Sequence, residues 1–432
     1  MTRRLPILVV GAGYVGLATA VFMAEQGFAV EVVEKNRSLL DSLRCGHLHF
    51  REPVLEKKLK RLLKQGRLSL CSPAKALYET PQFIFIAIDS AVPATARMRL
   101  TTFERLAEWI GDRKGVAAPT VVLKSTNVVG FAERFHGMLR QASGGKPIRL
   151  IVNPEFLREG HAYSDTAHPW RIIIGAARPA DAMSLRKLYR ATYPHSVPVI
   201  VTDWASAELI KLASNVYLSH RLAFIHEVAD FARGKGLDIS AIKRGIGLDP
   251  RIGIDYFQPG LGFGGSCLPK DCQMIGSAAF GEKFEFKTAK TALAINDRTL
   301  DILVARMRRE LGKLQGTRIA ILGAAFKAEG DDVRGSQAVK LALKLRKHGV
   351  TIALYEPFLK TAGRHLDRDL ALEADVNTAL RGAAAVIIGT PHRQFRTLSA
   401  EFAAGLMQRK VACDYFGIVN KREWIKKGFR FI

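Results

Sequence analysis

Residues 259–272, PGLGFGGSCLPKDC, place a thiol in a setting that suits covalent chemistry. Four glycines between positions 260 and 265 would let the backbone lie close against a ligand. Cys267 follows them near the start of an expected helix with Lys270 close by, a setting that lowers the pKa of a thiol and favours the nucleophilic thiolate. Asp271 is one helical turn further on, so its carboxylate would lie near the sulfur. The alternative is that Cys267 is a small buried hydrophobic residue.

The other four cysteines lack such a setting and are expected to be small buried residues. They are Cys45, Cys71, Cys272 and Cys413. All five are widely spaced and form no CxxC pair, so we predict neither a metal site nor a disulfide framework. A reducing, cytoplasmic compartment fits this cysteine usage.

Polar residues also recur on one face of an expected long helix. Lys211 and Asn215 are four residues apart and therefore share a face, which Glu208 and Trp204 extend. The stripe is polar where a core-facing stripe would be apolar. It is either a functional face or an ordinary solvated face of the helix.

Two further polar segments directly follow apolar strands. One is NPEFLREG at 153–160, which contains Glu155 and Glu159, and the other is KST at 124–126. Open α/β sheets bind ligands at the carboxyl ends of their parallel strands. Both segments are therefore candidate ligand-binding loops, although polar loops are common on any protein surface.

The sequence GAGYVG follows the first apolar strand and predicts a dinucleotide site. Gly11 permits a tight turn, Gly13 lets the backbone approach a pyrophosphate, and Gly16 lets the next helix pack closely on the strand. The N-terminus of that helix adds a positive dipole. Glu34 ends the second strand, where an acid binds the adenosine ribose and repels a 2′-phosphate. NAD is therefore favoured over NADP, although the basic residues just after Glu34 weaken this preference.

A framework of parallel strands must position these loops. The first 200 residues contain apolar runs that alternate with helical or loop segments, at 7–10, 29–33, 83–88, 120–123, 150–152 and 171–174. Runs that are apolar throughout are typical of parallel strands covered on both faces. We therefore expect a doubly wound α/β domain here.

The residue pattern changes at Asp203, where a long helical pattern begins and continues to Gly234. Further helices are expected at 240–245 and 287–311. The βαβ pattern returns from 317, but without GxGxxG, so a second nucleotide would not be bound there by the same turn. The predicted fold is α/β, with two Rossmann-like doubly wound parallel-sheet domains joined by a helical middle section with a long central helix. The expected boundaries are 1–203, 204–312 and 313–432.

Composition supports two or three globular domains and excludes fibrous or disordered classes. The chain has 432 residues, 48% of them hydrophobic and 24% charged. Lys and Arg number 65 against 40 Asp and Glu, a net charge of +25 that predicts anionic partners. Nucleic acid, an anionic membrane surface and a phosphate-bearing metabolite are the candidates. The excess is spread along the chain, and the basic runs near 57–64 and 421–427 are interpreted as solvated helix faces.

The uncharged stretch from Leu5 to Ala24 resembles a signal peptide or membrane span. Its three spaced glycines, and the second apolar strand that ends at Glu34, oppose that interpretation. No other segment has 18 uninterrupted apolar residues. We expect a soluble, cytoplasmic protein without stable membrane insertion.

Together, the motifs resemble the nucleotide-sugar 6-dehydrogenases, the UDP-glucose/GDP-mannose dehydrogenase family. GAGYVGL, KST, NPEFLREG, AELIKLASN, RIG and GFGGSCLPKD occur in the family's order over nearly the whole chain, and AFK and DDVRGS follow in the third section. GLDPRIG ahead of the cysteine looks most like the UDP-glucose branch. Because SCLPKD also occurs in GDP-mannose enzymes, GDP-mannose and UDP-N-acetylhexosamines stay as alternative substrates.

This resemblance implies a four-electron oxidation of a sugar C6 alcohol to a carboxylate, with two NAD used in turn. Cys267 would attack the intermediate aldehyde to give a thiohemiacetal, and then a thioester that water hydrolyses. Lys211 and Asn215 match residues that stabilise developing oxyanions. Thr126, Glu155 and Asp271 match positions that hold or activate water.

The resemblance also implies binding residues. Those for NAD, in the first domain with one from the third, are Gly11, Gly13, Tyr14, Val15, Gly16, Glu34, Lys35, Ser90, Ser125, Thr126, Glu159 and Arg334. Those for the UDP-sugar are Glu155, Phe156, Leu157, Lys211, Asn215, Arg251, Tyr256, Phe257, Gly264, Phe326 and Lys327. Arg251 would come from the partner in a homodimer built on the middle helices, and the third domain would hold UDP.

The sequence departs from the family pattern at three places. DSAVP at 89–93 replaces the usual Thr-Pro pair, KSTNVVG replaces KSTVPVG, and Glu34 stands where Asp is more common. These changes bear on cofactor affinity rather than on thiol chemistry. A different class of protein would be a catalytically idle, basic nucleic-acid binder on a Rossmann scaffold, but no aromatic stacking motif accompanies the basic residues, so nucleic acid is not expected as a partner.

Overall fold

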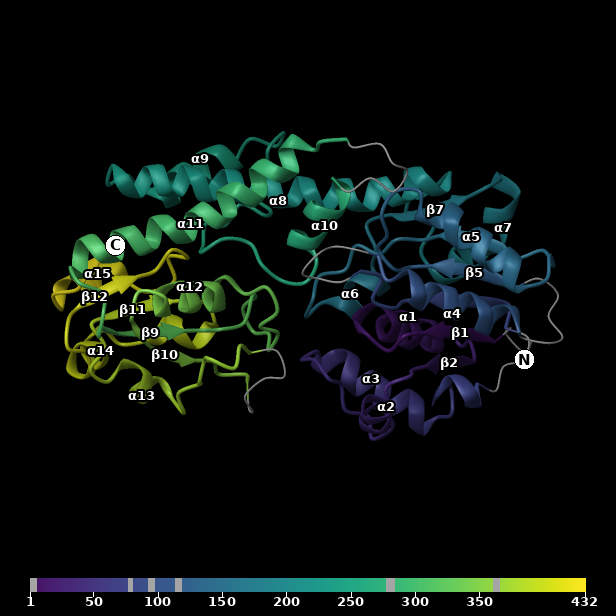
Figure 1. Ribbon diagram of the computed structural model, residues 1–432, viewed down its shortest axis with the longest axis horizontal. Helices are drawn as coiled ribbons and strands as arrows, with labels where there is room; N and C mark the ends of the chain where they lie inside the picture. Colours follow the sequence, from purple (N-terminus) through teal and green to yellow (C-terminus); the bar gives the residue numbers. More distant parts are fainter. Residues whose placement is uncertain (1–5, 77–80, 92–97, 113–118, 277–283, 360–365) are drawn as a thin grey trace. The chain divides into compact units, whose positions relative to one another are not determined.

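The computed structural model describes residues 6–76, 81–91, 98–112, 119–276, 284–359 and 366–432. The chain forms two compact units (Figure 1). The first comprises residues 1–214 and 274–285, and the second comprises 215–273 and 286–432. Val92 and Pro93 of the DSAVP segment lie outside the described residues.

The first unit is built on an eight-stranded sheet in the order β3-β2-β1-β4-β5-β6-β7-β8. The strands are β1 (Ile7–Val10), β2 (Val30–Val33), β3 (Leu68–Cys71), β4 (Phe83–Ile86), β5 (Thr120–Leu123), β6 (Arg149–Val152), β7 (Ile172–Ala176) and β8 (Val199–Thr202). All neighbours are parallel except β6 and β7. The α/β prediction is confirmed, with one antiparallel step that the purely parallel expectation missed. The segment between β6 and β7 stays at the carboxyl edge of β6 instead of crossing the sheet, which keeps NPEFLREG at that edge.

Helices cover both faces of this sheet because its strands are apolar on both sides. They are α1 (Tyr14–Glu25), α2 (Arg37–Arg44), α3 (Pro53–Lys64), α4 (Leu100–Gly111), α5 (Phe131–Ala142), α6 (Ala162–Ala167) and α7 (Pro179–Thr192). Alternate β1 residues, Ile7 and Val9, belong to a core with α1, α3 and α7. The rings of Phe103, Phe131 and Phe135 join α4 to α5 in a separate aromatic cluster.

The second unit contains a five-stranded, wholly parallel sheet in the order β10-β9-β11-β12-β13. Its strands are β9 (Arg318–Leu322), β10 (Thr351–Tyr355), β11 (Ala385–Ile388), β12 (Val411–Cys413) and β13 (Arg430–Phe431). Its helices are α9 (Ile239–Gly247), α10 (Leu268–Ile275, which ends in the first unit), α11 (Lys287–Leu311), α12 (Gln337–Arg346), α13 (Val376–Leu380), α14 (Ala400–Leu406) and α15 (Lys421–Lys426). The predicted return of βαβ topology is confirmed.

The long helix α8 (Trp204–Gly234) has 31 residues and begins in the first unit. The polar stripe predicted on it is buried: the exposed fractions are 3% for Glu208, 4% for Lys211 and 8% for Asn215. The alternative of a solvated helix face is therefore wrong. Buried polar side chains need partners, and each of these three has one.

Glu208 meets the N-terminus of α5. Its carboxylate accepts hydrogen bonds from the N–H groups of Gly130 at 2.6 Å and Ala132 at 2.8 Å. Burial raises the pKa of Glu208 from its ordinary 4.5 to about 7, although these backbone hydrogen bonds lower it. The side chain thus ties the start of α8 to the helix that follows the KST loop.

This buried carboxylate makes stability depend on pH. Since the pKa of Glu208 is higher in the folded protein, the folded state holds the proton more tightly, and the free energy of unfolding should fall as pH rises from about 4.5 to 7. The contribution is on the order of 3 kcal/mol at most. Denaturant titrations across this range on the wild type and on Glu208→Gln measure it. An identical pH slope in both proteins would contradict the assignment.

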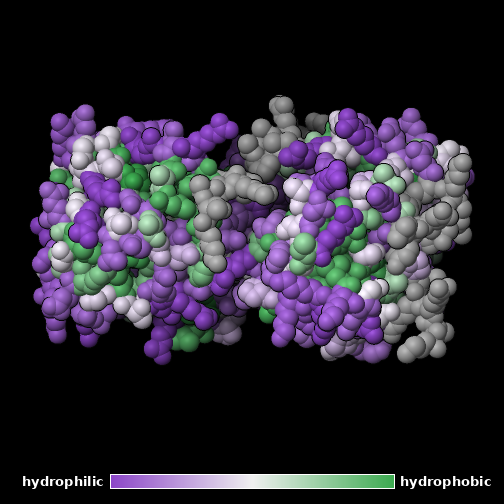
Figure 2. Space-filling view, turned by 90° about the horizontal axis from the view of Figure 1, so that it is seen from below, coloured by the Kyte–Doolittle hydropathy of each residue, from purple (hydrophilic) through white to green (hydrophobic). Residues whose placement is uncertain are grey.

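Surface features agree with most sequence expectations. Lys57, Lys60, Arg61 and Lys64 on α3, and the basic residues of α15, are exposed, as predicted for solvated helix faces. Lys58 of the first run is the exception, because it is partly buried and pairs with Glu25 at 2.7 Å. Figure 2 shows hydrophilic side chains over much of the visible face of each unit.

The expectation of a buried Cys45 is wrong, because Cys45 ends α2 at the surface. Cys71, Cys272 and Cys413 are buried, as predicted. Among the described residues, no helix is long and apolar enough to cross a membrane.

Candidate active site

The turn after β1 has the geometry that a dinucleotide requires. Gly11 has φ +102°, and a Cβ there would lie 2.5 Å from the carbonyl oxygen of Ala87. A Cβ at Gly16 would lie 1.9 Å from the carbonyl oxygen of Gly11, so both positions need glycine. At Gly13, by contrast, a Cβ would meet nothing within 4 Å. Gly13 therefore borders open space at the N-terminus of α1, which no side chain caps, and this arrangement fits a pyrophosphate.

Glu34 closes the same turn. Its carboxylate accepts hydrogen bonds from the N–H groups of Ala12 at 3.1 Å and Asn36 at 2.8 Å. These contacts hold the acid at the end of β2, where it can bind an adenosine ribose. Lys35 beside it is exposed. At the start of α1, the ring of Tyr14 stacks on Phe50, and the carbonyl of Val15 accepts from Thr19.

Glu34→Gln should raise the KM for NAD about tenfold, since a ribose loses its charged acceptor. The same change should lower the KM for NADP, because the repulsion of the 2′-phosphate disappears while Lys35 and Arg37 remain. Initial rates with each cofactor measure both effects. The control is Glu56→Gln, a partly exposed acid on α3. Unchanged KM values for both cofactors would contradict the role of Glu34.

The loops after β4 and β5 are tied together by two serines. Ser125 Oγ donates to the carbonyl of Ile88 at 2.7 Å and accepts from its N–H at 3.0 Å. Ser90 Oγ donates to the carbonyl of Thr126. The departure from the family pattern therefore places at position 90 a serine that bonds to the backbone of the KST loop, while Asp89 is exposed.

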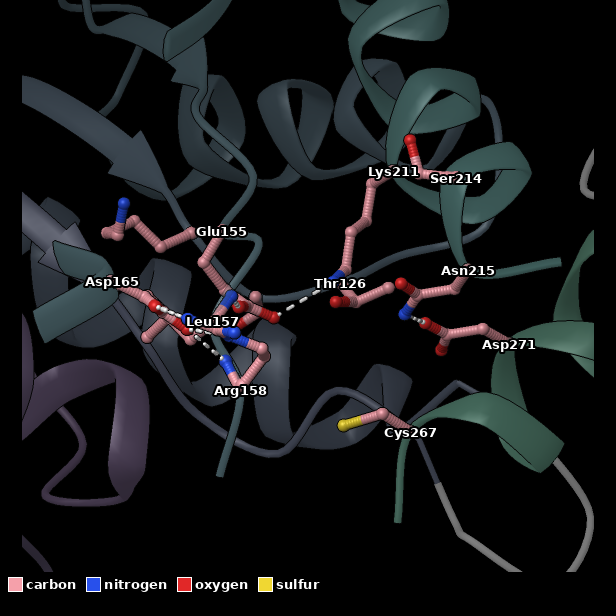
Figure 3. A network of polar contacts seen from close by, with 12 residues as sticks. Thr126, Glu155, Leu157, Arg158, Asp165, Lys211, Ser214, Asn215, Cys267 and Asp271 are labelled. Carbon is pink, nitrogen blue, oxygen red and sulfur yellow. Dashed lines mark hydrogen bonds and ion pairs between the residues drawn. The ribbon is translucent and has the colours of Figure 1, made fainter. Parts of the chain in front are cut away.

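Glu155 and Lys211 form a buried ion pair (Figure 3). Their charged atoms are 3.1 Å apart, and the side chains are 10% and 5% exposed. Glu155 also accepts from the N–H of Leu157 at 2.5 Å. The pair joins the NPEFLREG loop to α8, so the fold brings two predicted site residues together over 56 residues of sequence.

The same loop is fixed by Arg158, a residue that the sequence reasoning did not select. Its guanidinium binds the carboxylate of Asp165 through two hydrogen bonds of 3.0 and 2.7 Å, and its N–H adds a third at 2.8 Å. These contacts hold the pKa of Asp165 below its usual value despite burial. Phe156, Leu157 and Glu159 on this loop are partly buried.

In the second unit, Cys267 is exposed and directly precedes α10. The N–H of Asp271 donates to the carbonyl of Cys267 at 2.8 Å, so the predicted helical turn forms. The Asp271 carboxylate is buried and accepts from Asn215 Nδ2 at 2.5 Å and from Lys270 Nζ at 2.7 Å. The sulfur points away from this carboxylate in Figure 3. Lys270 thus pairs with Asp271, and Ser266 Oγ lies 3.5 Å from the sulfur.

At the glycines before Cys267, the protein itself occupies the space that a side chain would take, so close packing also requires glycine there. A Cβ at Gly260 would lie 2.5 Å from the ring of Phe416, and one at Gly262 would lie 2.5 Å from Asn296 Oδ1. At Gly264 it would lie 2.4 Å from the carbonyl oxygen of Gly335. The loop therefore packs tightly against the protein's own α11 and third section, which fixes the cysteine.

Two side chains that no sequence motif marks hold this loop. Asn296 on α11 accepts from the N–H of Phe263 at 2.6 Å and donates to its carbonyl at 3.0 Å. Gln337 at the start of α12 donates to the same carbonyl at 2.6 Å. Asn296 and Gln337 are 1% and 5% exposed, so they act as buried clamps on the cysteine loop.

Arg251 projects from a loop that Arg221 on α8 holds in place. Arg221 donates to the carbonyls of Ile252, Gly253 and Asp255 at 2.6, 2.9 and 3.1 Å. The side chain of Arg251 is 88% exposed and pairs with Asp249. Tyr256 has φ +54°, unusual for a residue with a side chain. Phe257 is buried and stacks on Phe224.

The loop after β9, which carries Phe326 and Lys327, resembles the dinucleotide turn but is closed. Gly323 has φ +96°, and Glu356 at the end of β10 accepts from the N–H groups of Ala324 at 2.7 Å and Ala325 at 2.8 Å. Unlike Glu34, Glu356 is buried and pairs with buried His392 at 3.2 Å. The Glu356 carboxylate therefore contacts protein groups where Glu34 could contact a ribose. This supports the expectation that a nucleotide here is not bound by the same turn.

Lys327 is partly buried on this loop. Arg334, further along, binds Asp332 through paired hydrogen bonds of 2.9 and 2.5 Å. The structure thus groups the predicted residues into two sets. One set, in the first unit, contains the dinucleotide turn with Thr126, Glu155 and Lys211, and the other, in the second unit, contains Asn215, Cys267, Asp271 and the Lys327 loop.

Three domain models of one protein family match this chain, in the same order along the sequence. Residues 5–193 match the NAD-binding domain of the UDP-glucose/GDP-mannose dehydrogenase family, 205–298 its central domain, and 320–421 its UDP-binding domain. A UDP-glucose 6-dehydrogenase of Bacillus subtilis is 32% identical over 94% of this chain and 92% of its own length. One of Rhizobium meliloti is 31% identical over 98% of both chains.

Solved structures show the same fold. A UDP-glucose dehydrogenase from Pyrobaculum islandicum has a TM-score of 0.88 at 34% identity, with 97% of this chain and 96% of that chain covered. A UDP-D-ManNAc dehydrogenase from Pyrococcus horikoshii has a TM-score of 0.86 at 24% identity, covering 99% and 98% of the two chains. At that lower identity the likeness concerns the fold alone.

Proposed function

Because the chain belongs to the UDP-glucose/GDP-mannose dehydrogenase family, and is thus an NAD-dependent nucleotide-sugar dehydrogenase, we propose that it oxidises UDP-glucose to UDP-glucuronate. The support for this substrate is the activity named for relatives at 31 to 34% identity. We assign NAD to residues 1–203, dimerisation to 204–312 and the UDP moiety to 313–432, in line with the order of the family domains.

The observation that carries the proposal is the exposed thiol of Cys267 at the start of α10. An enzyme that stops at an aldehyde needs no nucleophile. Oxidation to a carboxylate requires a carbonyl adduct that can lose a second hydride, and a thiolate forms that adduct and later leaves. The family match and this thiol together favour the four-electron reaction.

In the proposed mechanism, the dinucleotide turn with Glu34 would hold NAD, which would supply the hydride acceptor for each oxidation. Residues Thr126, Glu155 and Asp271 hold the water that receives the hydroxyl proton. The Cys267 thiolate then attacks the aldehyde carbon, and the resulting alkoxide is stabilised by the Lys211 ammonium and an Asn215 amide N–H. After the second oxidation, water attacks the thioester, the C–S bond breaks, and the thiolate leaves.

The test is NADH formation with UDP-glucose, GDP-mannose and UDP-N-acetylmannosamine in parallel. We expect two NADH per UDP-glucose and the highest kcat/KM for this substrate. A higher kcat/KM for another sugar would replace the substrate assignment, and no NADH with any of them would overturn the enzymatic role. Sugar identity and reaction type are thereby tested separately.

We further propose that the active form is a homodimer joined through α8. Tyr217, Phe224 and Phe231 recur every seven residues on this helix and are 59%, 44% and 66% exposed. Such a stripe of exposed aromatic side chains on one helix face is typical of a helix-packing interface. A second copy of the chain would cover it and would bring Arg251 to the neighbouring site.

Mixing two inactive variants tests the exchange of Arg251. Arg251→Ala and Cys267→Ala should each be inactive alone. Refolded together in equal amounts, they form hybrid dimers in which one site has both residues, so roughly a quarter of the wild-type activity should return. Phe224→Asp should lower the dimer fraction in sedimentation experiments. Mixtures without any recovered activity would contradict an Arg251 shared between subunits.

A further inference from the structure

A cavity of about 250 Å³ lies behind the NPEFLREG loop in the first unit. Its wall contains five charged side chains, those of Lys124, Glu155, Arg158, Asp165 and Arg171. In Figure 3, Arg158 and Asp165 lie on one side of Glu155 and Lys211 lies on the other. The cavity is therefore distinct from the face of Glu155 that pairs with Lys211.

The charges in this wall do not balance. Both carboxylates already have cationic partners, Glu155 with Lys211 and Asp165 with Arg158. Lys124 and Arg171 have no carboxylate partner in the part of the chain that the structure describes. Because Glu155 pairs with Lys211, which does not line the cavity, two cations of the wall, Lys124 and Arg171, are left without a paired carboxylate. A buried cation without a counter-ion is unfavourable, so an anion would stabilise this site.

Both unpaired cations keep hydrogen-bond donors in reserve. Lys124 Nζ donates to Asn153 Oδ1 at 2.9 Å and to the Asn153 carbonyl at 3.5 Å, and Tyr189 donates to Oδ1 at 2.5 Å. Arg171 donates from one nitrogen to Ser214 Oγ at 3.2 Å. A guanidinium has five N–H donors and an ammonium three, so donors on both remain for a ligand. Burial lowers the pKa of Lys124 to about 8, although Glu155 raises it.

Aromatic rings complete the wall. Phe156, Trp170, Tyr189 and Tyr193 all line the cavity. The Arg171 guanidinium lies 3.8 Å from the centre of the Phe156 ring. Trp170 is 72% exposed, so it borders both the cavity and solvent. A planar, apolar body would find contact surface between these rings.

We propose that this cavity binds a small aromatic monocarboxylate, on the side of the NPEFLREG loop that faces Arg158 and Asp165 rather than Lys211. A carboxylate matches the planar fork of Arg171, and its negative charge is attracted by both Arg171 and Lys124. Phosphate, with up to two charges, is less suited because Glu155 and Asp165 stand in the same wall. The occupant would contact Phe156 and so act on the loop that carries Glu155.

Isothermal titration of the full-length protein with benzoate, at constant ionic strength, tests the site. We expect saturable binding of one benzoate per chain, with acetate and inorganic phosphate at least tenfold weaker. Arg171→Leu and Lys124→Met should each weaken benzoate at least tenfold. Arg186→Leu, which removes an exposed arginine of α7 outside the cavity, should leave the affinity unchanged. Trp170→Ala, at an exposed position, should weaken it severalfold.

Three results would overturn the proposal. The first is benzoate binding that does not saturate, or that a tenfold molar excess of chloride abolishes. The second is an equal loss of affinity in Arg186→Leu and Arg171→Leu. The third is displacement of benzoate by saturating NAD or UDP-glucose. Phosphate that binds as tightly as benzoate would overturn the ligand class.

Titration with benzoate at pH 8, in buffers of different ionisation enthalpy, adds a second readout. Binding should take up as much as about half a proton in the wild type and none in Lys124→Met. None of these measurements depends on which sugar the enzyme oxidises.

Discussion

Cys267→Ala should abolish NADH formation from the nucleotide sugar, with a fall in kcat of roughly 10³-fold or more. Without the thiolate, the aldehyde from the first oxidation has no nucleophile to hold it, and the second oxidation has no adduct to act on. Steady-state rates and the number of NADH per sugar measure the loss. Binding of NAD and of the sugar should persist, because the dinucleotide turn and the Lys327 loop are unaltered.

The chain offers two matched controls for this change. Cys45→Ala removes the other exposed thiol and should leave the rate unchanged. Cys272→Ala removes a buried thiol five residues from Cys267. Burial raises the pKa of the Cys272 thiol. It should lower stability by about 1 kcal/mol while keeping most of the activity. Comparable rates in Cys267→Ala and Cys45→Ala would rule out the proposed nucleophile.

Lys211→Met should lower kcat by roughly 10²–10³-fold, because a fixed positive charge no longer stabilises the developing oxyanion. It should also destabilise the fold by about 3–5 kcal/mol, since Glu155 is left buried without its partner. Rates under saturating substrate and denaturant titrations measure the two effects. Lys187→Met, which removes an exposed lysine of α7, controls for the loss of charge.

The double variant Glu155→Gln/Lys211→Met separates the two roles of the pair. Replacing both partners removes the unpaired charge, so most of the stability should return. The rate should stay low, because neither the ammonium nor the carboxylate is present. Recovery of the rate together with stability would mean that Lys211 only supports the fold.

Local sequence rules predicted the parts of the site that depend on neighbouring residues. The GAGYVG turn works because Gly11 and Gly16 approach backbone atoms too closely for any side chain. Lys211 and Asn215 share a face because four residues make about one helical turn. The Cys267–Asp271 turn forms for the same reason. In these cases the spacing in the chain fixes the spacing in space.

Contacts between distant segments escaped prediction. Phe263 is 33 residues from Asn296 and 74 from Gln337, and Glu356 is 36 residues from His392. Nothing in their local sequence distinguishes these amides and this histidine from surface residues. The same is true of Cys45, whose expected burial proved wrong because α2 ends at the surface. Without the fold, the glycines before Cys267 suggested ligand contact and gave no sign of tight packing.

The sequence by itself determined the class of fold, the dinucleotide turn and the family, and it singled out Cys267 as the proposed nucleophile, because glycine sterics, strand hydrophobicity and helix periodicity act over a few residues. Only the tertiary structure decided that the polar stripe on α8 is buried and that Glu155 pairs with Lys211. It also decided that Glu356 pairs with His392 and that Lys124 and Arg171 line one cavity, where neither forms an ion pair with a carboxylate of the described residues. Burial and charge compensation depend on which distant elements the fold packs together, and no local pattern specifies that.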